Sequence, residues 1–188
     1  MKVGIAGGIG SGKSYVARRL ATHGIEVYDC DAAAKRLMRT SAELRQQLTD
    51  LIGPDTYLSD QLNKAAVSRF LLASEENAQA INAIVHPAVF ADFQQSGLQW
   101  LESAIMYESG ADRYVDRVIV VTAPEEIRVQ RIILRDGITH EQAMEWINRQ
   151  WPQDEVRRRA DYEIINDGQA DIDKQLNIIL EQLCNKPF

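Results

Sequence analysis

The chain has 188 residues, of which 45% are hydrophobic and 26% are charged. This length fits one domain with room for an additional subdomain. Its formal net charge of −6 argues against broad electrostatic binding of nucleic acid or of an acidic membrane surface. The sequence shows no apolar run of the length of a membrane span and no leader-like N-terminus, so we expect a cytoplasmic protein.

Short apolar segments alternate with helical patterns along the chain, which predicts a parallel sheet with helices on both faces. The five predicted strands are Lys2–Ala6, Ile25–Asp29, Ser103–Tyr107, Arg117–Ala123 and Tyr162–Asn166. Helix-start signals of the capping-box type occur at Thr40, Thr122 and Thr139, where Glu or Gln follows three residues later. We therefore expect an α/β fold with a five-stranded parallel sheet.

A long segment separates the second and third predicted strands, roughly Ala33–Gln95, and it carries helical patterns. An ordinary crossover between parallel strands is much shorter. We interpret the segment as a helical subdomain that binds substrate and is inserted into the sheet topology.

The stretch GGIGSGKS satisfies the phosphate-loop pattern G-x-x-x-x-G-K-[ST] between a predicted strand and a predicted helix. Glycines allow such a loop to point successive N–H groups at an anion beside the helix N-terminus. Lys13 would reach the β- and γ-phosphates of a nucleoside triphosphate, and the Ser14 hydroxyl would ligate Mg²⁺. The loop residues expected to bind the nucleotide are Gly8, Gly10, Ser11, Gly12, Lys13, Ser14 and Tyr15. The pattern alone does not separate a kinase from a GTPase, a motor or a regulatory module.

Two carboxylates, Asp29 and Asp31, follow the second predicted strand, at the end where open α/β sheets bind ligands. One would hold Mg²⁺ or its waters, and the other would accept a hydroxyl proton from a phosphoryl acceptor. The structural alternative is that Asp31 caps the helix that follows it. The two interpretations are compatible, and the carboxylate pair favours a kinase over a regulatory module.

Several other polar residues have both a functional and a structural interpretation. Arg128, Arg131 and Arg135 share one helix face, which is either solvated or gathers phosphates, and we expect phosphate contacts from Arg131 and Arg135. His86 is either structural or orients the acceptor. Glu108 either orders the site, including waters around Mg²⁺, or forms a buried ion pair.

Taken together, these segments resemble the dephospho-CoA kinase family over nearly the whole chain. GIAGGIGSGKS is similar to the family's first segment, DCDAAAK to its D-x-D-x-x-A-[RH] segment, and INAIVHPAVF to its I-x-H-P segment. IMYESGADRYVDRVIVV, RIILRDGITHEQA and RADYEIINDG resemble three later family segments in the same order. The chain departs from the family pattern at Tyr15 (usually Thr), at Lys35 (usually Arg or His), and at Val156, where a lysine is common beside Arg157.

The resemblance implies ATP-dependent phosphorylation of the ribose 3′-hydroxyl of dephospho-CoA, the last step of coenzyme A biosynthesis, with Mg²⁺. It implies a P-loop NTPase fold with a nucleotide core (residues 1–32, 98–135 and 160–188), a helical CoA-binding insert (about 33–97) and a lid (about 136–159). Asp31 would accept the ribose hydroxyl proton, and adenine would lie near Asn166. Residues expected at the substrate or in the lid are Lys35, His86, Glu108, Arg131, Arg135 and Arg157.

Two alternatives remain at this point. One is another small-metabolite kinase, acting on nucleosides, nucleotides or shikimate. The other is a nucleotide-binding regulatory module without an acceptor substrate.

Overall fold

The computed structural model describes residues 1–185, which form two compact units. One unit combines Met1–Tyr28 with the chain from Leu98 onward, and the other is Asp29–Gly97. The second unit spans the segment interpreted above as a helical insert. Residues 186–188, which belong to the predicted nucleotide core, lie outside the described part.

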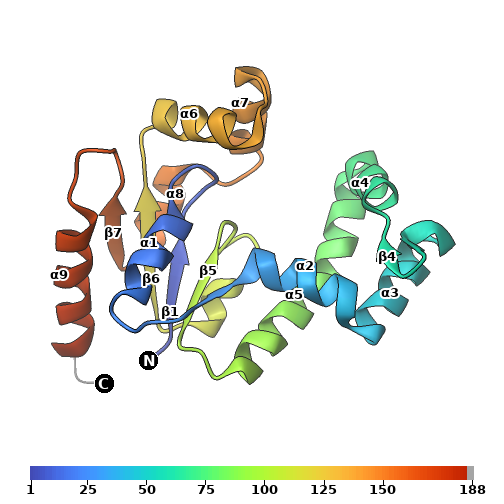
Figure 1. The fold of residues 1–188 in the computed structure, drawn as a ribbon, viewed down its shortest axis with the longest axis horizontal. Helices are drawn as coiled ribbons and strands as arrows, with labels where there is room; N and C mark the ends of the chain where they lie inside the picture. Colours follow the sequence, from blue (N-terminus) through green and yellow to red (C-terminus); the bar gives the residue numbers. More distant parts are fainter. Residues whose placement is uncertain (186–188) are drawn as a thin grey trace. The chain divides into compact units, whose positions relative to one another are not determined.

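A five-stranded sheet forms the centre of the first unit (Figure 1). Its strands are β1 (Val3–Ala6), β2 (Val27–Asp29), β5 (Trp100–Ser103), β6 (Arg117–Thr122) and β7 (Tyr162–Ile165), in the order β2-β5-β1-β6-β7. β1 pairs in parallel with β5 and β6, and β6 pairs in parallel with β7. The strand that leads into the phosphate loop is therefore the central one.

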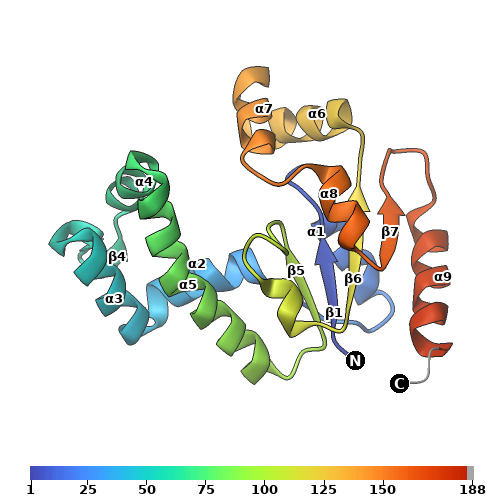
Figure 2. The same ribbon diagram turned by 180° about the vertical axis from the view of Figure 1, so that it is seen from behind.

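Helices cover both faces of this sheet, which confirms the predicted α/β fold (Figures 1 and 2). The helical elements of the first unit are α1 (Lys13–Ala21), η2 (Ala111–Tyr114), α6 (Glu125–Asp136), α7 (His140–Asn148), α8 (Gln153–Arg159) and α9 (Ile172–Asn185). α1 and α9 lie side by side on one face, and α8 lies on the other. Val16 and Leu20 of α1 and Leu176 of α9 pack with Ile5 and Ile119 of the strands in a buried core. Burial of such side chains stabilises each by about 1.5–3 kcal/mol.

One predicted strand is wrong in its position. The strand expected at Ser103–Tyr107 lies at Trp100–Ser103, where all four residues are buried. The Ser103 hydroxyl accepts a hydrogen bond from the Ile105 N–H at 3.3 Å, and this contact begins a turn rather than extending the strand. Met106 is buried from that turn, where its side chain lies against Gly4. Its apolar character therefore reflects packing and not strand pairing.

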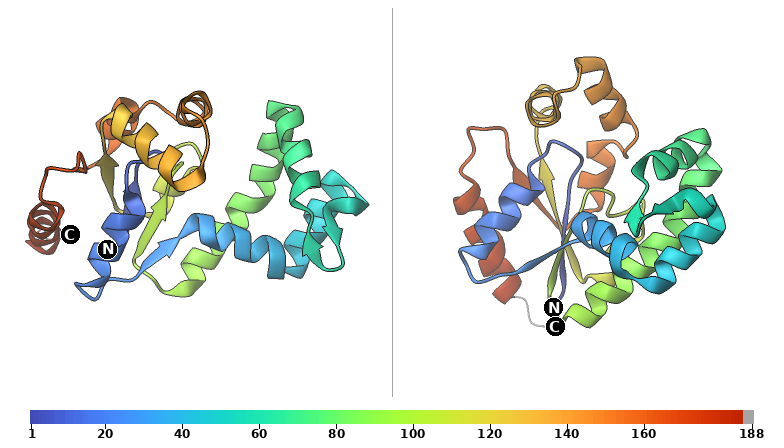
Figure 3. Two further views of the ribbon diagram at one scale, coloured as in Figure 1. Left: turned by 45° about the horizontal axis from the view of Figure 1, so that its top comes forward. Right: turned by 45° about the vertical axis from the view of Figure 1, so that its right-hand side comes forward.

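The second unit is a helical insert (Figure 3). Its elements are α2 (Cys30–Thr40), α3 (Ala42–Ile52), η1 (Pro54–Thr56), β3 (Tyr57–Leu58), β4 (Gln61–Leu62), α4 (Lys64–Ala73) and α5 (Glu75–Ser96). The long helix α5 packs against α2, α3 and α4, with Ile81, Val85 and Phe93 among its buried residues. In the described part of the chain, no helix has both the length and the apolar character needed to cross a membrane.

The predicted capping boxes agree with the structure at one site out of three. Thr139 caps α7 with the full reciprocal pair of hydrogen bonds, as predicted. The cap predicted at Thr40 is wrong, because Thr40 is the last residue of α2 and its neighbour Ser41 caps α3. The cap predicted at Thr122 is also wrong: its hydroxyl donates to a β7 carboxylate, and Pro124 precedes α6 without a side-chain cap.

Candidate active site

The phosphate loop, residues Gly7–Ser14, connects the buried strand β1 to α1. Gly12 is the N-cap of α1, with φ at +97°, a conformation that side-chain-bearing residues rarely adopt. A Cβ at Gly12 would also collide with the Asn166 amide. Backbone conformation and space therefore both require glycine here, so that the N–H groups of Lys13 and Ser14 lie at the positive end of α1.

A hydroxyl and a carboxylate meet at the start of α1. Ser14 Oγ donates to Glu102 Oε1 at 3.0 Å, and Glu102, on β5, is 7% exposed. Mg²⁺ is commonly bound by one or two protein oxygens together with substrate phosphates, and this donor pair fits that pattern. Lys13 Nζ lies 3.5 Å from the Gly8 carbonyl oxygen, within the same loop.

Glu102 was not among the predicted site residues, because the predicted strand began one position after it. The signal available in the sequence was a carboxylate close to the carboxyl end of a buried strand. Glu102 and Ser14 are 88 positions apart in the sequence, so no local sequence pattern predicts their contact.

Arg131 and Asn166 hold the carbonyl groups of the phosphate loop. The Arg131 guanidinium donates to the carbonyl oxygens of Gly10 and Ser11, at 3.2 Å each, and to Asn166 at 3.0 and 3.1 Å. Asn166, which is 9% exposed, donates in turn to the Ser11 carbonyl at 2.8 Å. Both residues thus support the loop, while a phosphate contact for Arg131 and an adenine contact for Asn166 stay predictions.

Arg128 and Arg135 differ although they lie on the same helix, α6. Arg128 is 5% exposed and its Nε donates to the Ile9 carbonyl at 2.9 Å. Desolvation lowers the pKa of this guanidinium, and the nearby Glu125 opposes the effect. Arg135 is exposed and pairs with Asp136 at 2.7 Å. On the helix face that carries the arginines, Arg128 is therefore buried against the phosphate loop, whereas Arg135 is exposed to solvent.

In the insert, Asp29 caps α2 by accepting a hydrogen bond from the Ala32 N–H at 2.8 Å. The structural alternative for Asp31, a helix cap, is thus wrong, because α2 begins at Cys30 and Asp31 lies inside its first turn. The Asp31 carboxylate is exposed, at the positive end of the helix dipole. Capping uses one carboxylate oxygen of Asp29, and the catalytic roles of Asp29 and Asp31 stay predictions.

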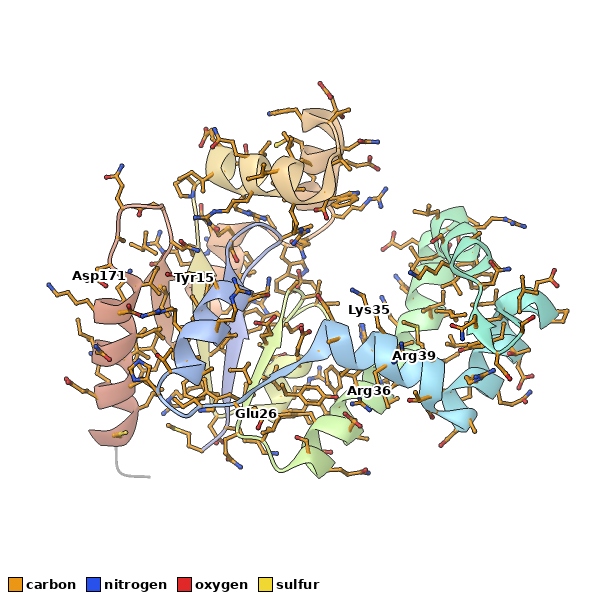
Figure 4. All side chains as sticks on the ribbon, viewed as in Figure 1. Tyr15, Glu26, Lys35, Arg36, Arg39 and Asp171 are labelled. Carbon is orange, nitrogen blue, oxygen red and sulfur yellow. The ribbon has the colours of Figure 1, made fainter. Side chains whose placement is uncertain are left out.

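Lys35 and His86 also belong to the insert. Lys35 is exposed on α2, and its neighbour Arg36 pairs with Asp92 of α5 at 2.5 Å (Figure 4). His86 lies half-buried on α5, with its ring centroid 6.1 Å from that of Phe90. Burial lowers the pKa of His86, which favours the neutral imidazole as a hydrogen-bonding group.

Glu108 anchors the segment that follows α7. Its Oε1 accepts a hydrogen bond from the Trp151 N–H at 3.0 Å, a backbone contact rather than the ion pair considered from the sequence. Tyr107 stacks on Trp151, with ring centroids 6.3 Å apart, and Arg159 lies 4.5 Å from the Trp151 centroid. Burial raises the pKa of Tyr107 to about 12, so its phenol stays neutral at physiological pH.

Two further predicted residues are exposed. Tyr15 is 45% exposed at the start of α1, so the phenol lies outside the loop that its backbone helps to form (Figure 4). Arg157 of α8 pairs with Glu163 of β7 at 2.8 Å. Phosphate contacts by the Tyr15 backbone N–H and by the Arg157 side chain stay predictions.

Comparisons with known proteins identify the family of this chain. The family model described as dephospho-CoA kinase matches residues 1–171. A dephospho-CoA kinase of Bacteroides fragilis is 37% identical over 193 residues, covering 99% of this chain and 94% of that protein. A crystal structure from Thermus thermophilus superposes with a TM-score of 0.84 at 31% identity, covering 97% of each chain. The dephospho-CoA kinase of Campylobacter jejuni, at 19% identity, shares the fold, with a TM-score of 0.67 over 97% of this chain and 98% of that one. The chain belongs to the dephospho-CoA kinase family.

Proposed function

We propose that this kinase transfers the γ-phosphoryl group of ATP to the ribose 3′-hydroxyl of dephospho-CoA, the last step of coenzyme A biosynthesis. The family match supports this reaction, since it includes both the phosphate loop and the whole insert. The observation that carries the donor side is the Ser14–Glu102 contact at the start of α1. We place the reaction in the cytoplasm, with a small molecule as the acceptor.

On the donor side, the loop N–H groups bind phosphate oxygens, and Lys13 reaches the β- and γ-phosphates. Arg128 and Arg131 hold the carbonyl oxygens of Ile9, Gly10 and Ser11 and so support the loop on its carbonyl side. Ser14 and Glu102 would hold Mg²⁺, which neutralises charge on the β- and γ-phosphates when bound.

On the acceptor side, Asp31 is the proposed general base. It lies two residues past the end of β2, exposed and not engaged as a cap. Asp31 would take the proton of the 3′-hydroxyl as the ribose oxygen attacks the γ-phosphorus and ADP leaves. Lys35, one turn further along α2, would bind anionic groups of dephospho-CoA, and His86 would orient it.

Replacement of the base tests this assignment. Asp31→Asn should leave the dissociation constant for ATP nearly unchanged and lower kcat by about a hundredfold or more, as expected for loss of a general base. Asp50→Asn, the same substitution at an exposed position of α3, serves as the control. Calorimetry with ATP and a coupled assay of ADP release measure the two quantities. Full turnover by Asp31→Asn would remove Asp31 from this role.

A further inference from the structure

Ile9, the third residue of the phosphate loop, is held through both of its backbone groups. Its N–H donates to Gln150 Oε1 at 2.7 Å, and its carbonyl accepts from Arg128 Nε at 2.9 Å. Its side chain packs against a buried cluster between α6 and α7, consisting of Val129, Ile132, Ala143 and Ile147. We call residues 125–150 the arm. The arm thus contacts Ile9 through the side chain, the N–H and the carbonyl.

Gln150, at the end of the arm, has a second contact. Its Nε2 donates to the Ala104 carbonyl at 3.3 Å, directly after β5 and two residues past Glu102. A carboxamide accepts with one atom and donates with the other, so one side chain links the loop to the end of β5. The absence of a side chain at Gly8 makes room for this link. A Cβ there would lie 3.0 Å from Gln150 Oε1 and would collide with the Arg128 guanidinium.

We propose that Gln150 is a positioning residue for the donor phosphate, which fixes the Ile9 peptide and couples the arm to the γ-phosphate side of the loop. In a phosphate loop, the N–H groups near the start of the helix cradle the α- and β-phosphates. The γ-phosphate therefore extends toward the first half of the loop, where Ile9 lies. The inference rests on the proposed nucleotide site and adds a residue that the sequence did not single out.

Because Gln150 contacts the loop at Ile9, its loss should affect the binding of ATP more than that of ADP. Loss of the two Gln150 hydrogen bonds should release the Ile9 peptide and weaken ATP binding, whereas ADP has no group on that side of the loop. Loss of one neutral hydrogen bond changes an equilibrium constant a few-fold, so loss of both bonds should raise the dissociation constant for ATP about tenfold.

The test compares Gln150→Ala and Gln150→Glu with the control Arg149→Ala in the full chain. Arg149 is exposed directly after α7, and its ion pair is with Glu145 of that helix. Calorimetry gives dissociation constants for ATP and ADP, and steady-state assays give kcat and KM. For Gln150→Ala, we expect the dissociation constant for ATP to rise about tenfold and that for ADP less than about twofold. Gln150→Glu can still accept from the Ile9 N–H but cannot donate to Ala104, so we expect a smaller rise in its dissociation constant for ATP, of a few-fold.

Three results would overturn the proposal. Equal losses of ATP and ADP affinity would show that Gln150 has only a general structural role. A Gln150→Glu variant whose dissociation constant for ATP equals that of the unmodified protein would show the same. A gain in ATP affinity for Gln150→Ala would show that the link opposes nucleotide binding. Failure of the unmodified protein to bind ATP would refute the proposed nucleotide site itself, so the two failures are distinguishable.

Discussion

At the scale of single residues, His86 links the stability of the insert to pH. Burial lowers the pKa of His86 in the folded state, while the unfolded value is about 6.5. The unfolded chain therefore binds the proton first on acidification, and the free energy of unfolding falls as the pH drops below about 6.5.

His86→Gln should reduce this pH dependence. We expect the melting temperature of the variant, followed by circular dichroism, to fall less between about pH 7.5 and pH 5.5 than that of the unmodified chain. His23→Gln, at an exposed position after α1, is the matched control. An unchanged pH dependence in His86→Gln would contradict the assignment.

The phosphate-loop residues could be predicted because their chemistry is encoded by local spacing. Glycines, Lys13 and Ser14 occur within eight residues, between a strand and a helix. Glu102 and Gln150 could not be predicted in this way, because their contacts with the loop span 88 and 141 residues. Such contacts depend on strand order and helix packing, which a single sequence does not specify.

At the scale of elements, helix boundaries explain most of the differences between prediction and structure. Thr40 and Ser41 are adjacent hydroxyl residues, and either would cap a helix in isolation. The helical conformation is interrupted at Ser41, which has an extended backbone (φ −81°, ψ 116°) and whose hydroxyl accepts from the Leu44 N–H. The hydroxyl of Thr40 instead donates to the Arg36 carbonyl within α2. Which residue leaves the helical conformation is decided by packing of α2 and α3 against α5.

This boundary can be tested with two alanine variants. Ser41→Ala should lower the free energy of unfolding by about 1 kcal/mol through loss of the cap. Thr40→Ala should cost clearly less, because Thr40 caps no helix and alanine has the higher helix propensity at this last position of α2. Urea unfolding followed by circular dichroism compares them. A larger loss for Thr40→Ala than for Ser41→Ala would restore the boundary expected from the sequence.

At the scale of the whole molecule, the alternation of strands and helices was enough to predict the five-stranded parallel sheet. The unusual length of the segment between two strands led to the prediction of an insert at about 33–97, and the structure has a compact unit at Asp29–Gly97. That unit has its own buried residues, including Leu44, Leu48 and Phe93. The donor and acceptor assignments therefore belong to different units, Lys13 and Ser14 to one and Asp31 to the other.

The proposed reaction has dephospho-CoA as its acceptor. The most direct measurement is ADP release from ATP and Mg²⁺ with dephospho-CoA, a nucleoside, a nucleotide, shikimate or no acceptor, with the product of each reaction identified by phosphorus NMR. We predict rapid ADP release with dephospho-CoA alone, in step with formation of a ribose 3′-phosphate. Preferential phosphorylation of another acceptor, or slow ADP release that does not depend on any acceptor, would contradict the claim.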